Sequence, residues 1–318
     1  MKRILSLGGG GIKGAMTAAY LAHMEKASGK PIADCFDLIA GTSTGGILAI
    51  GLALGVKASD LVKFYQEQGP KIFPVDRNYS AMNTLMHLCR TKYSSSALVD
   101  ALKTQFADRT LGAATTRLVI PSVQPDKAQM YLFKTRHHAL FKRDHLISAL
   151  DVALATSAAP SYLPPHTIQG VGIFADGGLW ANNPVGLAVT EAVSYLNWEP
   201  EELHVLSIEC PQESQTIPAG SAFAWLMGPK VMNRLGALQT SAAKGTALAL
   251  MRDVGNLPRP ARYFEALQSG FPPGYFSLDG VKQIDALIGV GNDEARKQSN
   301  LIVETFMSNS KIEFMPSL

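Results

Sequence analysis

The sequence predicts an α/β fold in which helices flank a mainly parallel central sheet. Its N-terminal part alternates short apolar runs with longer segments of helical periodicity, in the order strand, helix, strand, helix. This alternation is typical of a doubly wound sheet whose strands run parallel. The chain has 318 residues, of which 47% are hydrophobic and 17% are charged, so it can bury a large core.

The individual elements follow from apolar runs and helical spacing. Residues 3–7 predict a short strand, and residues 15–28 carry apolar side chains at helical spacing. Residues 36–40 predict a second buried strand, which is followed by an apolar helix over 46–55. The same two patterns predict later strands at 117–123, 129–134, 173–175 and 203–209, and helices at 146–156 and 185–195.

We expect the chain to form a single domain over residues 1–318. The motif-bearing core covers about 4–210, and residues 211–318 form a C-terminal elaboration. Proline and glycine cluster at 211–229 and 255–274, so this elaboration is expected to alternate loops with helices. The sequence contains no internal repeat or low-complexity linker that would mark a domain boundary.

The composition argues against several classes of protein. Lysines and arginines number 29 against 26 acidic residues, and this scattered excess is too small to predict binding of a DNA or RNA duplex. The three cysteines are far apart and lack metal-ligand spacing, so we expect neither a disulfide framework nor a zinc site bound by cysteines. No other metal and no cofactor is expected either. Glycines from Gly8 onward interrupt the apolar N-terminus, which argues against a secretory signal and for a cytoplasmic protein.

The strongest functional signal is the G-x-S-x-G sequence that contains Gly41, Ser43 and Gly45. It follows a predicted strand and precedes an apolar helix, which is the setting of a nucleophile on a tight turn. The Oγ atom of Ser43 would then lie exposed at the strand end, near the positive end of the next helix. The alternative is a glycine- and serine-rich turn without chemistry.

The second signal is the glycine loop Gly8–Gly14, between the first predicted strand and the first helix. Its unobstructed backbone N–H groups can bind a phosphate or an oxyanion. Residues 9–14 also match the dinucleotide fingerprint G-x-G-x-x-G, which requires an acidic residue at the end of the second strand. That strand runs instead into the Ser43 turn, so an oxyanion hole explains both loops and a Rossmann-type site explains only one.

The third signal is Asp176, which is followed by Gly177 and Gly178 and preceded by the apolar residues 171–175. A carboxylate at the edge of a sheet can accept the proton of a serine if burial makes it more basic. The alternative is an Asx-turn, in which Asp176 binds its own downstream backbone.

Together, the three motifs resemble those of the patatin-like phospholipases. Further matches are DLIAGTS at 37–43, ATSAAP at 155–160 and FADGG at 174–178, so the resemblance covers about residues 4–210. It implies a three-layer α/β fold with a mainly parallel central sheet. It also implies a Ser–Asp dyad that needs neither histidine nor metal.

The resemblance also implies a role for single residues. Ser43 is the nucleophile, and Asp176 is the base that activates it. The backbone amides of Gly9, Gly10 and Gly11 form the oxyanion hole. Lys13 fills the basic position of this oxyanion-hole motif. The residues that support the motifs are Gly14, Gly41, Gly45, Gly177 and Gly178. The implied substrates are acyl esters of glycerophospholipids, as for a phospholipase A or a lysophospholipase.

A finer resemblance concerns a bacterial branch of the family. Residues 71–74, 92–94, 133–135 and 180–184 are similar to that branch, which includes phospholipase effectors of anti-phage signalling activated by cyclic oligonucleotides. It implies a cyclic di- or trinucleotide activator and a homo-oligomer. Residues 207–211 read S-I-E-C-P where such relatives have a glycine-rich S-x-G-T-G turn, and this departure leaves the regulatory assignment open.

The histidines were considered as members of an ordinary Ser–His–Asp triad or of a metal site. In the chain order of α/β-hydrolases the histidine follows the acid, and only His204 follows Asp176. It lies in an apolar strand, which favours a core or edge histidine. His137 and His138 lie in a polar, basic loop without a carboxylate at ligand spacing, so no metal site is expected there.

Two segments combine apolar and basic residues and are candidates for contact with lipid or for a lid, namely 73–93 and 223–235. Each can equally be an ordinary core-facing helix. We expect a lipid acyl hydrolase that associates peripherally with membranes when it is active. The alternatives are a constitutive lipid esterase without nucleotide control, a Rossmann-type nucleotide-binding protein and a catalytically silent module.

Overall fold

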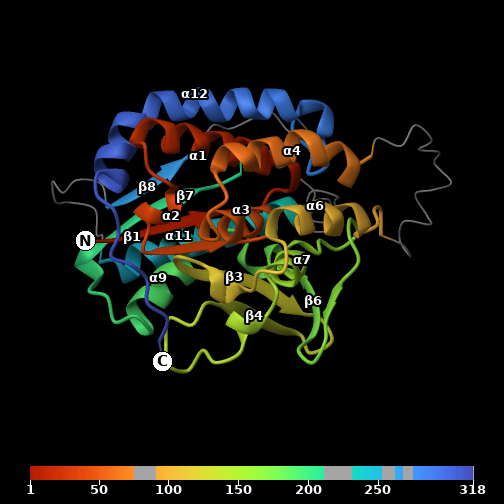
Figure 1. Ribbon diagram of the computed structural model, residues 1–318, viewed down its shortest axis with the longest axis horizontal. Helices are drawn as coiled ribbons and strands as arrows, with labels where there is room; N and C mark the ends of the chain where they lie inside the picture. Colours follow the sequence, from red (N-terminus) through yellow and green to blue (C-terminus); the bar gives the residue numbers. More distant parts are fainter. Residues whose placement is uncertain (75–90, 211–230, 253–261, 268–274, 318) are drawn as a thin grey trace, which may run out of the picture.

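The computed structural model describes residues 1–74, 91–210, 231–252, 262–267 and 275–317. Over these residues, an eight-stranded sheet forms the centre of the fold and helices cover both of its faces (Figure 1). The strand order is β5-β6-β3-β2-β1-β7-β8, and β4 pairs with β3 outside this path.

Most neighbouring strands of the sheet run parallel. The parallel set consists of β1 (Lys2–Leu7), β2 (Leu38–Gly41), β3 (Arg117–Gln124), β7 (Leu203–Ile208) and β8 (Tyr263–Ala266). The strands that join by antiparallel pairing are β4 (Gln129–Lys134), β5 (His166–Ile168) and β6 (Gly172–Asp176). The mainly parallel sheet predicted from the sequence is confirmed.

The helices that matter for the site connect these strands. They are α1 (Gly14–Ser28), α2 (Ile32–Cys35), α3 (Thr44–Ala53), α4 (Ala58–Ile72), α6 (Ser96–Phe106), α7 (Ala149–Ser157), α8 (Gly178–Ala181), α9 (Val185–Ser194), α11 (Val231–Leu250) and α12 (Ile284–Ile302). The strands and helices that we predicted are all present, and each begins and ends within three residues of its expected position.

Several elements were not predicted individually, among them β8 and α12. Strand β8 has only four residues, too few for a recognisable period, and its pairing with β7 stabilises it. Helix α12 contains Gly289 and Gly291, which weaken its local helix propensity. A Cβ atom at position 291 would overlap with the Met16 carbonyl of α1, so glycine allows the close packing of α12 on α1.

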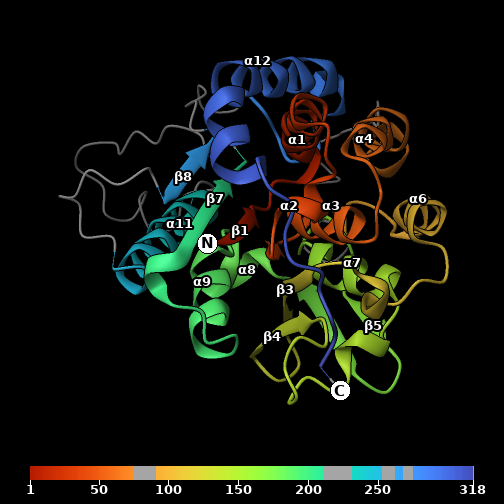
Figure 2. The ribbon, with the colours of Figure 1, turned by 60° about the vertical axis from the view of Figure 1, so that its left-hand side comes forward.

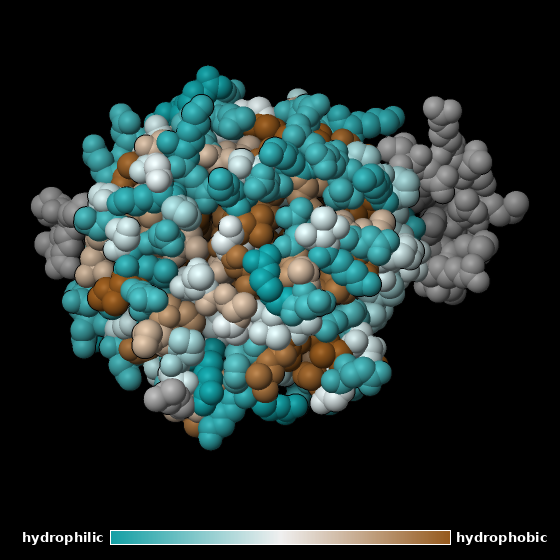
Figure 3. Space-filling view, viewed as in Figure 1, coloured by the Kyte–Doolittle hydropathy of each residue, from teal (hydrophilic) through white to brown (hydrophobic). Residues whose placement is uncertain are grey.

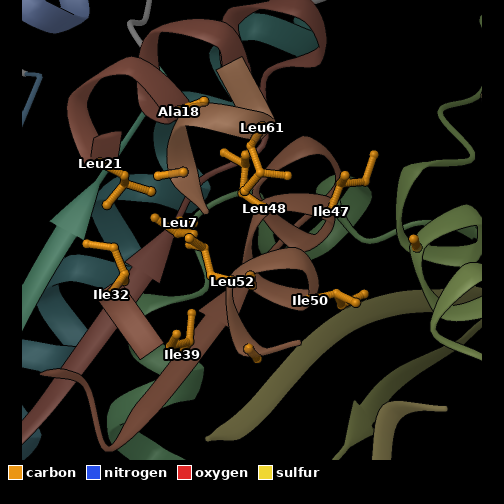
Figure 4. Packing of buried hydrophobic residues seen from close by; sticks show 14 of the residues in the cluster. Leu7, Ala18, Leu21, Ile32, Ile39, Ile47, Leu48, Ile50, Leu52 and Leu61 are labelled. Carbon is orange, nitrogen blue, oxygen red and sulfur yellow. The ribbon is translucent and has the colours of Figure 1, made fainter. Parts of the chain in front are cut away.

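One face of the sheet is covered by α1 and α3, and α12 packs on α1. Leu5 and Leu7 of β1 point to this face and are fully buried. Figure 4 shows Leu7 and Ile39 of the neighbouring strands on the side of the sheet that carries Leu48 and Leu52 of α3. Burial of these aliphatic side chains removes apolar surface from water and is the main source of stability for this layer.

The opposite face packs against α9 and α11. Ile4 directly precedes Leu5 in β1, so its side chain points to this opposite face. There it belongs to a second buried cluster with Val189 of α9 and Ala247 of α11. Figure 2 shows α9 and α11 on one side of β1 and β7, and α1 and α12 on the other. This alternation along β1 produces three layers, as the sequence predicted.

Among the described helices, none has the length and the apolar character needed to cross a bilayer. The face in Figure 3 is largely hydrophilic and carries separate groups of hydrophobic residues. Of the two candidate lipid-contacting segments, residues 75–90 and 223–230 lie outside the described part, and Phe73 packs edge-on against Tyr93 with ring centroids 5.2 Å apart.

Candidate active site

The site forms where β2 and β6 end against the same edge of β3. Ala40 of β2 pairs with Val119, and Asp176 of β6 pairs with Ser122. Strand β4 pairs with β3 over residues 119–124, so it occupies the opposite edge. Strands β2 and β6 therefore approach each other end to end, and the turns that follow them meet although they are distant in sequence.

The turn after β2 holds Ser43 in a strained conformation. Its φ of 55° and ψ of −123° lie in a region that non-glycine residues rarely adopt. The backbone of the turn packs so closely that two of its positions require glycine. A Cβ atom at Gly45 would overlap with the Leu7 carbonyl, and one at Gly41 would overlap with the Gly45 carbonyl. Ser43 therefore precedes α3 directly and lies at the positive end of its dipole.

Ser43 and Asp176 are in direct contact. The Oγ atom of Ser43 donates a hydrogen bond of 2.6 Å to Oδ2 of Asp176. The amide of Gly178 donates to the other carboxylate oxygen, also at 2.6 Å, and so orients the carboxyl group. Asp176 is buried, and this desolvation raises its pKa to about 6 although both hydrogen bonds act in the opposite direction. The carboxylate is thus a stronger base than an exposed aspartate.

Thr156, near the end of α7, connects both turns. Its Oγ1 accepts the amide of Ser43 at 3.0 Å and donates to the carbonyl of Pro121 at 2.6 Å. Its carbonyl accepts the amide of Gly177 at 3.2 Å. Thr156 lies within the ATSAAP segment at 155–160, but its role could not be predicted from the sequence, because these contacts depend on the packing of α7 against β3.

The glycine loop lies beside the dyad, and most of its amides are already bound. The amide of Gly8 donates to Ile208 at 2.9 Å, that of Gly9 to Asn182 at 3.0 Å, and that of Ile12 to Leu278 at 2.8 Å. Within the described residues, the amides of Gly10 and Gly11 have no acceptor. Gly9 was expected to contribute to the oxyanion hole, but its N–H group is occupied by Asn182, so only the next two amides are available.

The remaining predicted residues lie around this loop. Gly14 is the first residue of α1, and Lys13 precedes it in a short 3-10 turn. The amide of Lys13 turns back onto the carbonyl of Gly10 at 3.2 Å, which closes the turn. Gly11 has a φ of +59°, and a Cβ atom there would overlap with the Leu278 carbonyl. Glycine is therefore required at position 11 for two independent reasons.

The family model of the patatin-like phospholipases matches residues 5–189, which is more than half of the chain. The chain belongs to this family. The matched region contains the glycine loop, the Ser43 turn and Asp176.

Several curated proteins are similar to this patatin-like chain. A cGAMP-activated phospholipase of Pseudomonas aeruginosa is 38% identical over 69% of this chain and 65% of its own length. A protein of the same name from Escherichia coli is 35% identical over 72% of this chain and 70% of its own length. Patatin-like protein 2 of Arabidopsis thaliana is 36% identical, over 61% and 53%. Thus the chain spans about two thirds of the length of the two bacterial relatives and about half of that of the plant relative.

Among solved structures, the crystal structure of VipD from Legionella pneumophila aligns with 94% of this chain and 66% of its own. The sequence identity is 12% and the TM-score is 0.49. The family assignment rests on the family model and on the curated relatives.

His204 lies far from the dyad of this patatin-like chain. In the parallel pairing of β1 and β7, His204 is opposite Arg3, whereas Leu7 at the other end of β1 is opposite Gly41. His204 and the Ser43 turn are therefore at opposite ends of the parallel strands. The Nδ1 atom of His204 lies 3.2 Å from the carbonyl oxygen of Glu202. His204 thus lies near the start of an internal strand, between β1 and β8, and away from the Ser43 turn.

His137 has a carboxylate neighbour that its sequence context did not reveal. It is buried, and its Nε2 atom lies 3.0 Å from the carboxylate of Glu191 of α9. Glu191 also forms an ion pair with Lys134 at 2.6 Å. Burial lowers the pKa of His137, although Glu191 acts in the opposite direction. The described part of the chain contains no group of three or more His, Cys, Asp or Glu side chains suited to a metal ion. Lys134, His137 and Glu191 thus form a paired polar network between β4 and α9.

Proposed function

We propose that the chain is a serine hydrolase of lipid acyl esters, of the phospholipase A or lysophospholipase type. The hydrogen bond between Ser43 and Asp176 carries this proposal, because it joins a nucleophile on a strained turn to a buried base. The family membership and the names of the bacterial relatives support it.

In the first half of the reaction, Ser43 Oγ attacks the carbonyl carbon of the ester and its proton passes to Oδ2 of Asp176. The tetrahedral intermediate places negative charge on the former carbonyl oxygen, where the amides of Gly10 and Gly11 are available as donors. When the intermediate collapses, the protonated Asp176 gives its proton to the leaving alcohol oxygen. The acyl group remains as an ester on Ser43.

In the second half, a water molecule attacks the acyl-enzyme and Asp176 accepts its proton. Collapse of the second intermediate returns that proton to Ser43 and releases the fatty acid. A single carboxylate can serve both halves because its raised pKa, about 6, lets it hold a proton transiently near neutral pH. The bond from Gly178 keeps the carboxylate oriented throughout.

The substrates that we propose are phospholipids at a membrane surface, which the protein reaches by peripheral association. The active protein is proposed to be cytoplasmic and to form a homo-oligomer. Constitutive hydrolysis would damage the membrane of the host cell, so a resting state with low activity is an advantage.

We further propose that a cyclic di- or trinucleotide activates the enzyme. The support is the similarity to the two bacterial relatives named cGAMP-activated phospholipase, at 35% and 38% identity. A ligand can shift a resting population of 1% to 99% only if it binds the active state about 10⁴-fold more tightly. A constitutive esterase is the competing function, and it requires no such ligand.

One experiment with two comparisons tests these proposals. Purified protein is incubated with vesicles of mixed phospholipids, with and without cyclic nucleotides, and the released fatty acids are measured by mass spectrometry. Release that depends on Ser43 is expected, because Ser43→Ala removes the nucleophile while it leaves the core volume unchanged. Equal release by wild type and Ser43→Ala would refute the hydrolase, whereas full activity without nucleotide would refute only the activation.

A further inference from the structure

The C-terminal residues 275–283 contact the glycine loop directly, although they lie outside the matched family region. The carbonyl of Leu278 accepts the amide of Ile12 at 2.8 Å. The same carbonyl faces Gly11, where only a residue without Cβ leaves room for it. Leu278 thus determines the conformation of the loop at the residue that follows the two unoccupied amides.

Asp279, the next residue, ties this segment to a different part of the molecule. Its Oδ2 atom accepts a 2.8 Å hydrogen bond from the hydroxyl of Tyr93 and an ion pair from the ammonium group of Lys92. The side chain of Asp279 is 13% exposed, so solvent screens these contacts only partly. Burial raises the pKa of Asp279, but the bonds from Lys92 and Tyr93 outweigh it and leave that pKa below its usual value.

The partners of Asp279 are in turn attached to the dyad side of the site. The backbone amides of Lys92 and Tyr93 donate to the carbonyls of Ser161 and Tyr162, both at 2.9 Å. That segment follows Ala158, whose carbonyl accepts the amide of Asp176 at 3.0 Å. A continuous chain of bonds therefore leads from the glycine loop through Leu278 and Asp279 to the backbone beside Asp176.

We propose that Asp279 is a positioning residue that holds the glycine loop, through Leu278, in the conformation that presents the Gly10 and Gly11 amides to the oxyanion. It touches neither substrate nor dyad. Its effect is to keep the distance between the donors and Ser43 constant, which matters because oxyanion stabilisation depends on preorganised donors. This inference rests on the proposed hydrolase function for its consequence, but the contact itself can be tested without activity.

The experiment compares Asp279→Ala with the matched control Asp285→Ala. Asp285 lies six residues further on, is exposed, and bonds to Gln66 on α4 rather than to the glycine-loop network. Hydrogen–deuterium exchange is measured on the peptide that covers residues 8–13. We expect exchange in Asp279→Ala to be faster by about tenfold or more, because the Ile12 amide loses its fixed acceptor, and exchange in the control to match wild type.

The second readout concerns the transition state. A fluoroketone lipid analogue forms a tetrahedral adduct with an active serine, so its affinity reports on the oxyanion donors. For Asp279→Ala we expect kcat to fall by about tenfold to a hundredfold, and the affinity for the fluoroketone to fall by the same factor. We expect KM to change by less than about twofold. Tyr93→Phe, which removes one hydroxyl group, should show a smaller effect in the same direction. It decides the matter if Asp279→Ala does not fold.

The outcomes separate the two proposals. Unchanged exchange at residues 8–13 in a folded Asp279→Ala or in Tyr93→Phe would overturn the role of Asp279, whatever the activity. Equal kcat and fluoroketone affinity in Asp279→Ala and Asp285→Ala would overturn it as well. A wild-type protein that neither hydrolyses lipid nor binds the fluoroketone would refute the hydrolase function, while the exchange experiment would still test the contact.

Discussion

The side chain of Thr156 accepts the main-chain amide of Ser43 at 3.0 Å, across 113 residues of sequence. This bond occupies the backbone donor of a residue whose φ of 55° is unfavourable by itself. Because the same hydroxyl donates to Pro121 of β3, Thr156 attaches the nucleophile turn to the centre of the sheet. The strained turn is thus maintained by a helix that is remote in the chain.

The first prediction concerns this attachment. Thr156→Val keeps the shape of the side chain but removes both hydrogen bonds, so it should lower the free energy of unfolding by about 1–2 kcal/mol and kcat by about tenfold. Thr156→Ser, which keeps the hydroxyl, should retain most of both. Urea unfolding and initial rates on a soluble ester measure the two effects. Wild-type kcat in a folded Thr156→Val would show that the turn holds its geometry without this bond.

The second prediction concerns the base. Asp176→Asn should reduce kcat by several orders of magnitude, because an amide cannot accept the proton of Ser43. His204→Ala is the matched control and should change kcat little, since His204 lies at the opposite end of the parallel strands from the Ser43 turn. A loss of activity in His204→Ala at unchanged Tm would instead indicate a conventional triad.

The third prediction concerns stability and pH. The pKa of Asp176 is raised from 3.8 to about 6, so the native state binds this proton more tightly than the unfolded chain does. This group therefore reduces the stability of the protein as pH rises from about 4 to about 6, by up to about 3 kcal/mol. Asp176→Asn should be more stable than wild type at pH 8 by about 1–3 kcal/mol and gain nothing at pH 3.5. Thermal melts across this range measure the difference, and a constant difference would contradict the raised pKa.

The fourth prediction is the pH dependence of catalysis. Only the ionised form of Asp176 can accept the serine proton, so kcat/KM should fall about tenfold per pH unit below about 6. A soluble ester avoids effects of pH on vesicles, and an exposed-site variant such as Asp285→Asn is expected to give the same curve. A midpoint near 4 would mean that the burial of Asp176 does not persist in the working enzyme.

The fifth prediction concerns crowding of the oxyanion loop. A Cβ atom at Gly10 would overlap with the side chain of Cys210, so Gly10→Ala should depress kcat by about tenfold or more. The added substitution Cys210→Gly removes the obstructing atoms and should restore part of the rate. Gly11→Ala meets the backbone of Leu278 at a positive φ and should not be rescued by Cys210→Gly. Equal rescue of both variants would show that the two positions are not distinguished by these contacts.

Much of the fold could be predicted because its signals are local. Strand β1, the glycine loop and α1 follow one another within the first 28 residues, and alternating or helical spacing identifies each one. The Ser43 turn is local as well, since a strand, a tight turn and a helix supply its whole context within 38–53. Strand β8 escaped prediction because its four residues become a strand only by pairing with β7.

The sequence by itself determined the order of the elements, the tight turn at Ser43 and the candidate base Asp176. Only the tertiary structure decided that these two residues meet, because their contact depends on β2 and β6 ending against one edge of β3. The tertiary structure also decided which loop amides remain available, because the carbonyl of Asn182 accepts the Gly9 amide and the carbonyl of Leu278 accepts the Ile12 amide. Hydrogen bonds between residues far apart in the chain depend on packing, and no pattern within a short stretch of sequence specifies them.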